Sequence, residues 1–123
     1  MRILLDTHII IWHLKGDKRL NPRQGEILEH EGNEKIVSLI SLWEIAIKVN
    51  IGKLQLQVPI DNIIPPDTTL LPLLTSHILQ YQSLPLHHRD PFDRMLIAQA
   101  QMEGLQIMTD DPNFPLYDIK ILL

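Results

Sequence analysis

The chain has 123 residues, a hydrophobic fraction of 45% and a formal net charge of −4 at pH 7. This length is enough for a substantial core, so we expect one domain over residues 1–123. The negative charge argues against a protein that coats nucleic acid by charge alone, but it is compatible with carboxylates that hold divalent cations.

The composition also limits the location of the protein. No cysteine is present, which excludes disulfides and thiolate metal sites and permits a reducing cytoplasm. No apolar run is long enough to cross a bilayer, and Asp6 interrupts the apolar N-terminal run. We therefore expect a cytoplasmic protein with neither a membrane segment nor a secretory signal.

The first predicted element is a buried strand over residues 1–5, a short apolar run that ends at Asp6. A helix begins over residues 9–14, so Asp6 lies at the C-terminal end of a strand, where ligands bind in open α/β sheets. The alternative is that Asp6 only caps this helix. An exposed helix over 22–32 and a second short strand over 36–38 follow.

The next helix is predicted over residues 42–51. Ser41 precedes it and Glu44 stands three residues later, which is the spacing of a capping box. Lys48 is four residues beyond Glu44 and can form an ion pair with it along the helix. These contacts offer a purely structural role for Glu44, beside a functional one. Gly52 is expected to end the helix.

The middle of the chain is less regular. We expect an extended segment over 54–58, one helical turn over 60–64 and a third strand over 68–71. Thr75 or Ser76 is expected to cap a short helix that reaches Ser83. Leu84-Pro85 would then end that helix.

The strongest helix start in the chain is Asp90-Pro91-Phe92-Asp93. Asp90 suits the N-cap, Pro91 the first helical position, and Asp93 the third. Both aspartates have a capping role as the alternative to a functional one. The helix is predicted to reach residue 103, with Gly104 as its C-cap. Strands over 105–108 and 119–122 complete the pattern.

Alternating strands and helices with short connections predict an α/β fold, with a parallel sheet of four to five short strands flanked by helices. Acidic residues then recur at the C-terminal edge of the sheet: they are Asp6, Glu44, Asp93 and Asp111. Carboxylates gathered in one place repel one another unless a cation lies between them. Mg²⁺ prefers such oxygen ligands, and it can activate water and stabilise charge on a phosphoryl group.

Motifs in this order resemble the PIN-domain family, and within it the VapC-type toxins of bacterial toxin–antitoxin pairs. The matching pieces are LLDTH at 4–8, SLISLWEIAIKVNIGKL at 38–54, HRDPFDRMLIAQA at 88–100 and TDDPNF at 109–114. The resemblance implies a PIN-like fold and a metal-dependent ribonuclease that uses Mg²⁺ or Mn²⁺. It also implies a VapB-like antitoxin as partner, RNA as substrate and a homodimer.

The resemblance implies catalytic and metal-binding roles for Asp6, Glu44, Asp93 and Asp111. Asp110 is an alternative to Asp111, because the family's fourth acid is variable. Thr7 and Ser41 are expected to donate hydrogen bonds to these acids or to metal-bound waters. Asp90 is expected to cap its helix or to support the site from behind the metal ligands, where Thr109 and Asp110 are also placed.

Other residues near the motifs each have two candidate roles. Arg89 and Arg94 are candidates for RNA phosphate contacts, with an exposed helix charge as the alternative. His87 and His88 are candidates for moving protons, with loop packing as the alternative. The apolar side chains of Trp12, Trp43, Ile47 and Ile51 are candidates for an antitoxin groove or a dimer face, with core burial as the alternative.

Rival functions are weaker. A receiver domain needs an early acidic pair and a late lysine beside a strand, and a dehalogenase-type phosphatase needs an aspartate where His8 stands. A PIN-like module that binds RNA or protein without cutting is the main alternative to the enzyme.

Overall fold

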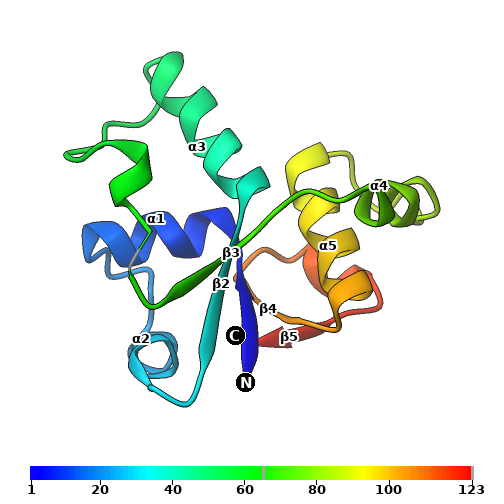
Figure 1. Ribbon diagram of the computed structural model, residues 1–123, viewed down its shortest axis with the longest axis horizontal. Coiled ribbons are helices and arrows are strands. Elements are labelled where there is room, and N and C mark those ends of the chain that lie inside the picture. The colour runs from blue at the N-terminus through cyan, green and yellow to red at the C-terminus, as the bar shows by residue number, and fades with distance from the viewer. Residues whose placement is uncertain (65, 123) are drawn as a thin grey trace.

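We describe a computed structural model of the chain, which covers residues 1–64 and 66–122. In these residues five strands form one parallel sheet in the order β3-β2-β1-β4-β5, with helices on both faces (Figure 1). The strands are β1 (Arg2–Leu5), β2 (Glu34–Ser38), β3 (Thr68–Leu71), β4 (Gln106–Met108) and β5 (Lys120–Leu122). The α/β prediction is confirmed.

The helices are α1 (Thr7–Lys15), α2 (Pro22–Glu29), α3 (Leu39–Asn50), α4 (Thr75–Gln82) and α5 (Pro91–Glu103). Two 3₁₀ turns, Ile60–Asn62 and Phe114–Leu116, lie within the described connections. The predicted extended segment over 54–58 contains no strand. Pro65, at the end of the expected 60–64 turn, lies outside the described residues.

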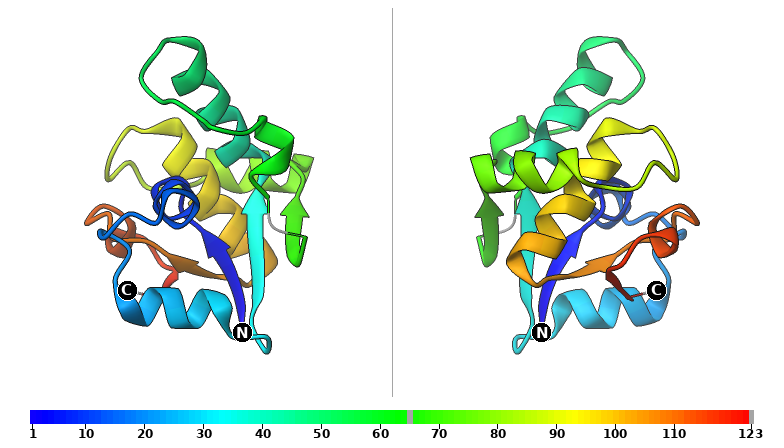
Figure 2. Two further views of the ribbon diagram at one scale, coloured as in Figure 1. Left: turned by 90° about the vertical axis from the view of Figure 1, so that its left-hand side faces the viewer. Right: turned by 90° about the vertical axis from the view of Figure 1, so that its right-hand side faces the viewer.

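Helices lie on both sides of the sheet (Figure 2) and bury most of β1 and β2, whereas the edge strands β3 and β5 are partly exposed. On one face, Ile3 and Leu5 of β1 pack with α1 and α2. On the other face, Leu4 and Ile107 pack against α5. Helix α3 rises from the C-terminal end of β2 and contributes Ile40 to one cluster and Ile45 to the other.

The topology creates a crevice at the C-terminal edge of the sheet. Strands β2 and β3 lie on one side of the central strand β1, and strands β4 and β5 lie on its other side. Leu4 of β1 pairs with Ile36 of β2 and with Ile107 of β4. The order therefore reverses between β1 and β4, and ligands of open α/β sheets bind at such a reversal.

Two predicted helix starts are wrong. Helix α3 begins at Leu39, and its cap is Ser38, whose Oγ accepts a hydrogen bond from the backbone N of Ile40 at 3.1 Å. Ser41 therefore lies inside the helix and forms no capping box with Glu44. The cause is that two serines precede the apolar stripe, and the one that directly ends β2 has the extended backbone that a cap requires.

Helix α4 begins after Leu74 rather than after Thr75 or Ser76. Its first turn is held by the side chain of His77, whose Nδ1 accepts a hydrogen bond from the backbone N of Leu74 at 3.0 Å. A histidine three residues into the helix takes the place that a hydroxyl cap was expected to fill.

Candidate metal centre

Asp6 and Asp111 approach the crevice from neighbouring strands. Asp6 directly follows β1 and is 2% exposed, while Asp111 comes three residues after the end of β4. Asp6 stands at the N-cap position of α1, but within the described residues its carboxylate makes no capping hydrogen bond. Asp6 therefore holds the cap position without capping the helix through its side chain, and the carboxylate is left available at the edge of the sheet.

Asp93 comes from the first turn of α5, and Asp90 does the capping there. Asp90 Oδ1 accepts hydrogen bonds from the backbone N of Phe92 at 2.9 Å and of Asp93 at 3.0 Å. Pro91 occupies the first turn, where its missing N–H costs nothing. Since Asp90 satisfies the helix end, the buried Asp93 carboxylate is not needed as a cap.

Glu44 lies in the second turn of α3 and is also buried. The predicted ion pair with Lys48 is present, with 3.5 Å between Nζ and Oε2. The other carboxylate oxygen, Oε1, is buried and has no hydrogen-bond partner among the described residues. The ion pair therefore accounts for only one side of this carboxylate.

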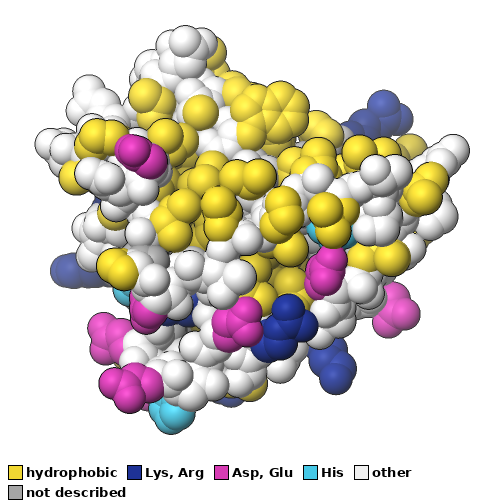
Figure 3. Space-filling model, in the orientation of Figure 1, with side chains coloured by type: hydrophobic (Ala, Val, Ile, Leu, Met, Phe, Trp, Pro, Cys, Tyr) yellow, Lys and Arg dark blue, Asp and Glu magenta, His cyan; other side chains and the backbone are white. Residues whose placement is uncertain are grey.

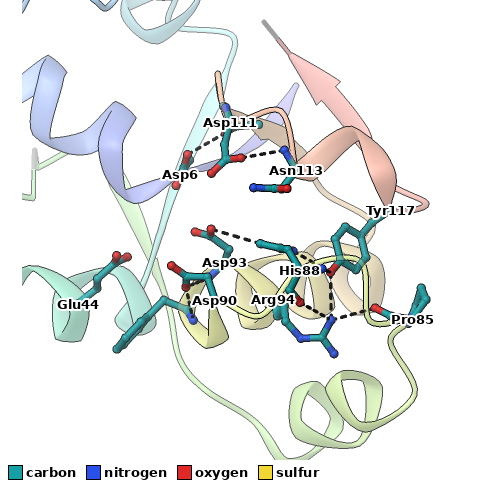
Figure 4. A network of polar contacts seen from close by, with 12 residues as sticks. Asp6, Glu44, Pro85, His88, Asp90, Asp93, Arg94, Asp111, Asn113 and Tyr117 are labelled. Atoms are coloured by element: carbon teal, nitrogen blue, oxygen red, sulfur yellow. Dashed lines mark hydrogen bonds and ion pairs between the residues drawn. The ribbon is translucent and has the colours of Figure 1, made fainter.

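The four acids surround one space between α3, α5 and the ends of β1 and β4 (Figure 4). Burial raises the pKa of Asp93 to about 8, with further contributions from the charges of Asp90, Asp6, Asp111 and Glu44. Burial likewise raises the pKa of Asp6, which the charges of Glu44 and Asp111 raise further and a hydrogen bond from Thr109 lowers. The acids therefore affect one another as a cluster.

Thr109 links Asp6 to Asp111. Its buried hydroxyl donates to Asp6 Oδ2 at 2.8 Å and accepts from the backbone N of Asp111 at 3.0 Å. Asp111 Oδ1 accepts from the backbone N of Asn113 at 2.8 Å, which closes a turn. Thr109 therefore lies in hydrogen-bond contact with an acid, as a supporting residue of the site would.

Asp110 points elsewhere. Its side chain is exposed, and Oδ1 accepts a hydrogen bond from Nε2 of Gln24 in α2 at 2.9 Å. Asp111, by contrast, contributes to the pKa of both Asp6 and Asp93. This geometry favours Asp111 over Asp110 as the fourth acid.

Thr7 and Ser41 meet beneath the acids. The Thr7 hydroxyl donates to the Ser41 hydroxyl at 2.9 Å, and both side chains are buried. This contact joins the first turn of α1 to α3, so it fixes the elements that carry Asp6 and Glu44. The Thr7 hydroxyl therefore donates its hydrogen bond to Ser41 and not to one of the acids.

A chain of polar contacts from Arg94 through Tyr117 and His88 approaches Asp93. Nη1 of Arg94 donates to the Tyr117 hydroxyl at 3.0 Å, and that hydroxyl lies 2.8 Å from His88 Nδ1. His88 Nε2 lies 3.4 Å from Asp93 Oδ2. Because the Tyr117 oxygen accepts from Arg94, its proton is available to His88 Nδ1. His88 Nε2 and Asp93 are within ion-pair distance but form no hydrogen bond, since this nitrogen has no hydrogen-bond partner in the described part of the chain. Figure 4 shows this chain.

The two roles expected for Arg94, an RNA contact or an exposed charge, are both wrong. The side chain is 6% exposed, and its guanidinium also donates to the carbonyl of Pro85 at 2.9 Å and lies over the ring of Tyr81. Arg94 is one residue from Asp93 on a helix, so the two side chains point in different directions. Arg89 is exposed, as either role would require.

Replacing Arg94 with alanine should lower the free energy of unfolding by ~3 kcal/mol, because buried acceptors lose their donor and a cavity is left. Arg94→Lys should recover only part of this loss, since one ammonium cannot replace the planar fork. Urea unfolding followed by circular dichroism measures both values. Arg89→Ala is the matched control and should change stability by less than ~0.5 kcal/mol. Equal, small losses in all three variants would contradict the structural role of Arg94.

The donor set fits a hard divalent cation. Asp6 Oδ1 and Glu44 Oε1 are buried oxygens without hydrogen-bond partners in the described part of the chain, and such atoms are costly unless a cation or donor satisfies them. In residues 1–64 and 66–122, no three acidic or histidine side chains are already grouped as ligands of one ion. The acids are thus placed around a common space without being drawn together.

The comparisons with known proteins agree with this fold. The family model described as PIN domain matches residues 3–120, so the chain belongs to the PIN-domain family. No curated protein matches. Within the described residues, no helix has the length and apolar character needed to cross a membrane.

Several solved structures are similar over nearly the whole chain. VapBC2 from Rickettsia felis, bound to a DNA fragment from its promoter, gives a TM-score of 0.75 at 14% identity and covers 99% of this chain and 98% of that one. VapBC-1 from nontypeable Haemophilus influenzae gives a TM-score of 0.69 at 19% identity and covers 99% of this chain and 97% of that one. FitAcB from Neisseria gonorrhoeae gives a TM-score of 0.64 at 19% identity and covers 98% of this chain and 96% of that one. At these identities the likeness concerns the fold.

Proposed function

We propose that the protein is an endoribonuclease that depends on Mg²⁺ or Mn²⁺ and acts as the toxin of a VapBC-type toxin–antitoxin pair. The observation that carries this proposal is the buried cluster of acids, in which Asp6 and Glu44 each keep one oxygen without a hydrogen-bond donor. Membership of the PIN-domain family supports a nuclease. The likenesses to VapBC2, VapBC-1 and FitAcB favour a toxin among such nucleases.

In the proposed reaction, Asp6, Glu44, Asp93 and Asp111 hold one or two cations. When bound, the cation would lower the pKa of a water and stabilise negative charge on the phosphoryl oxygens. The water would release one proton to solvent as its oxygen attacks phosphorus in line, the bond from phosphorus to the 3′ oxygen would break, and that oxygen would take up a proton from solvent. The products carry 5′-phosphate and 3′-hydroxyl ends.

The neighbouring residues orient the carboxylates. Thr109 donates to Asp6 Oδ2 and leaves Oδ1 without a hydrogen-bond partner among the described residues, so that oxygen would be available to a cation. His88, held by Tyr117, places Nε2 at 3.4 Å from Asp93 Oδ2 without forming a hydrogen bond. A hydrogen bond such as the one from Thr109 holds a carboxylate in the orientation that cation binding needs.

A free ribonuclease would harm its own cell, so the proposal includes a VapB-like antitoxin and a cytoplasmic location. Hydrophobic side chains gather on one face over α3 and α4 (Figure 3). Trp43 is 60% exposed and Ile51 is 56% exposed, whereas Trp12 and Ile47 are partly buried. We assign the exposed apolar face to protein contacts, with the antitoxin or with a second copy in a homodimer.

Cleavage of RNA by purified, antitoxin-free protein tests the proposed function. Total RNA is incubated with Mg²⁺ or Mn²⁺, with EDTA, and with the Asp93→Asn variant. We expect cleavage that depends on the metal and is lost in the variant. RNA binding by a folded protein that cleaves no RNA pool would favour the non-catalytic PIN module instead.

A further inference from the structure

A hollow of about 430 Å³ adjoins the candidate metal centre. Asp6, Asp110 and Asp111 form part of its wall, so the hollow is bounded by two of the four candidate metal-binding acids and by Asp110. The rest of the wall comes mainly from α1 and from the loops after α1 and β4. Its volume is in the range of sites that take small molecules or a single nucleotide.

The wall opposite the acids carries an aromatic ring and a guanidinium. Trp12 of α1 is partly buried, and Arg19 lies over its ring at 5.1 Å from the ring centre. Asp17 engages Nε and Nη2 of Arg19, the latter at 2.8 Å, which leaves Nη1 for another partner. The ring of His8, one helical turn before Trp12, is exposed and also lines the hollow.

We propose that this hollow is a subsite for one nucleotide of single-stranded RNA next to the cleaved bond. A base stacks on the paired Trp12 and Arg19 side chains, and Nη1 of Arg19 contacts a backbone phosphate. Proteins that bind single-stranded RNA use aromatic rings and guanidinium planes in this way. The inference rests on the proposed ribonuclease function, and it names a binding site that the acids alone do not provide.

The charges of the wall set a condition on RNA binding. Asp6, Asp110 and Asp111 line the hollow and repel a polyanion, while Arg19 contributes a positive charge that Asp17 partly offsets at 2.8 Å. RNA is therefore expected to bind when a divalent cation neutralises the acids, and Arg19 then supplies the contact to phosphate. The apolar side chains suited to a protein partner gather instead over α3 and α4, and neither helix contributes to this wall.

Binding is measured by fluorescence anisotropy with a labelled 12-nucleotide RNA of random sequence, in Mn²⁺, on the full chain carrying Asp93→Asn to prevent cleavage. In that parent, Arg19→Ala and Trp12→Ala should each raise Kd ~10-fold or more. Trp12→Phe should keep most of the affinity. Lys18→Ala is the matched control, because Lys18 is exposed, adjacent and outside the wall, and it should change Kd less than ~2-fold.

Salt dependence separates a phosphate contact from a structural effect. Arg19→Ala should reduce the slope of log Kd against log salt concentration by ~0.7, the value for one phosphate of a single strand. Lys18→Ala should leave it unchanged. Unchanged affinity in Arg19→Ala, equal losses in Arg19→Ala and Lys18→Ala, or a parent that binds no RNA would overturn the subsite. So would variants that lose only antitoxin binding.

The binding and cleavage measurements distinguish failure of the nucleotide subsite from failure of the proposed ribonuclease function. If wild-type protein cleaves RNA but the Arg19 and Trp12 variants bind it normally, the nuclease stands and the subsite falls. If the variants bind weakly but wild-type protein cleaves nothing, the subsite stands and the enzyme falls. Arg19 is exposed, so this arm holds even if Trp12→Ala does not fold.

Discussion

Replacing Asp6 with asparagine is expected to lower the rate of RNA cleavage by at least ~1000-fold while the protein stays folded. The variant keeps the shape and the acceptor for Thr109, but it removes a negative charge from the candidate metal centre. A loss of ~4 kcal/mol in transition-state stabilisation, a usual contribution of a catalytic cation, corresponds to this factor. Initial cleavage rates in Mn²⁺, with circular dichroism as the fold check, measure it.

Asp110→Asn is the variant to compare with Asp111→Asn, because the Asp110 carboxylate is exposed and bound by Gln24 although it lines the adjoining hollow. We expect it to retain cleavage within a few-fold, whereas Asp111→Asn should lose most of it. If Asp110→Asn abolished cleavage and Asp111→Asn did not, the fourth acid would be Asp110. Full cleavage by folded Asp6→Asn would contradict the assignment of the metal centre.

The metal-free protein is expected to lose stability as the pH rises from about 4 to about 8. Asp93 has a native pKa of about 8, against 3.8 for a free side chain. Between these values the folded state holds a proton that the unfolded state has released, so raising the pH favours unfolding. A difference of one unit between the native and unfolded pKa of a group changes the free energy of unfolding by ~1.4 kcal/mol. Urea unfolding in EDTA at several pH values measures the trend.

Asp93→Asn should remove much of this pH dependence and stabilise the metal-free protein by at least ~1 kcal/mol at pH 8. Asp118→Asn is the control, since Asp118 is exposed and should leave the slope unchanged. An Asp93→Asn protein that is less stable than wild type at pH 8 and keeps its pH slope would show that Asp93 is not held under electrostatic strain.

Much of the fold followed from the sequence because the strands and helices are bounded by strong local signals. The apolar run before Asp6 and the Asp90-Pro91 start with Gly104 as the stop are such signals, and β1 and α5 lie where they predict. Strand alternation then placed the acids on one sheet edge. The register and the order of strands depend on contacts between distant segments, which local patterns do not encode.

The cap of α3, the burial of Arg94 and the contact of Arg19 with Trp12 could not be predicted from local sequence patterns. Ser38 and Ser41 offer the same cap chemistry three residues apart, and only the end of β2 decides between them. Arg94 looks like a surface charge in sequence, but Tyr117 from the far end of the chain buries and binds it. Arg19 meets Trp12 through a loop conformation set by Asp17. Each case depends on tertiary structure.

The most direct test of the metal centre is calorimetric titration of metal-free protein with MnCl₂ at pH 7, in two buffers of different ionisation enthalpy. We predict binding by wild-type protein with release of about one proton, because the cation displaces the proton that Asp93 holds. Asp93→Asn should bind more weakly and release none. Equal binding by wild type, Asp6→Asn and Asp93→Asn, or no binding by the folded wild type, would contradict the account.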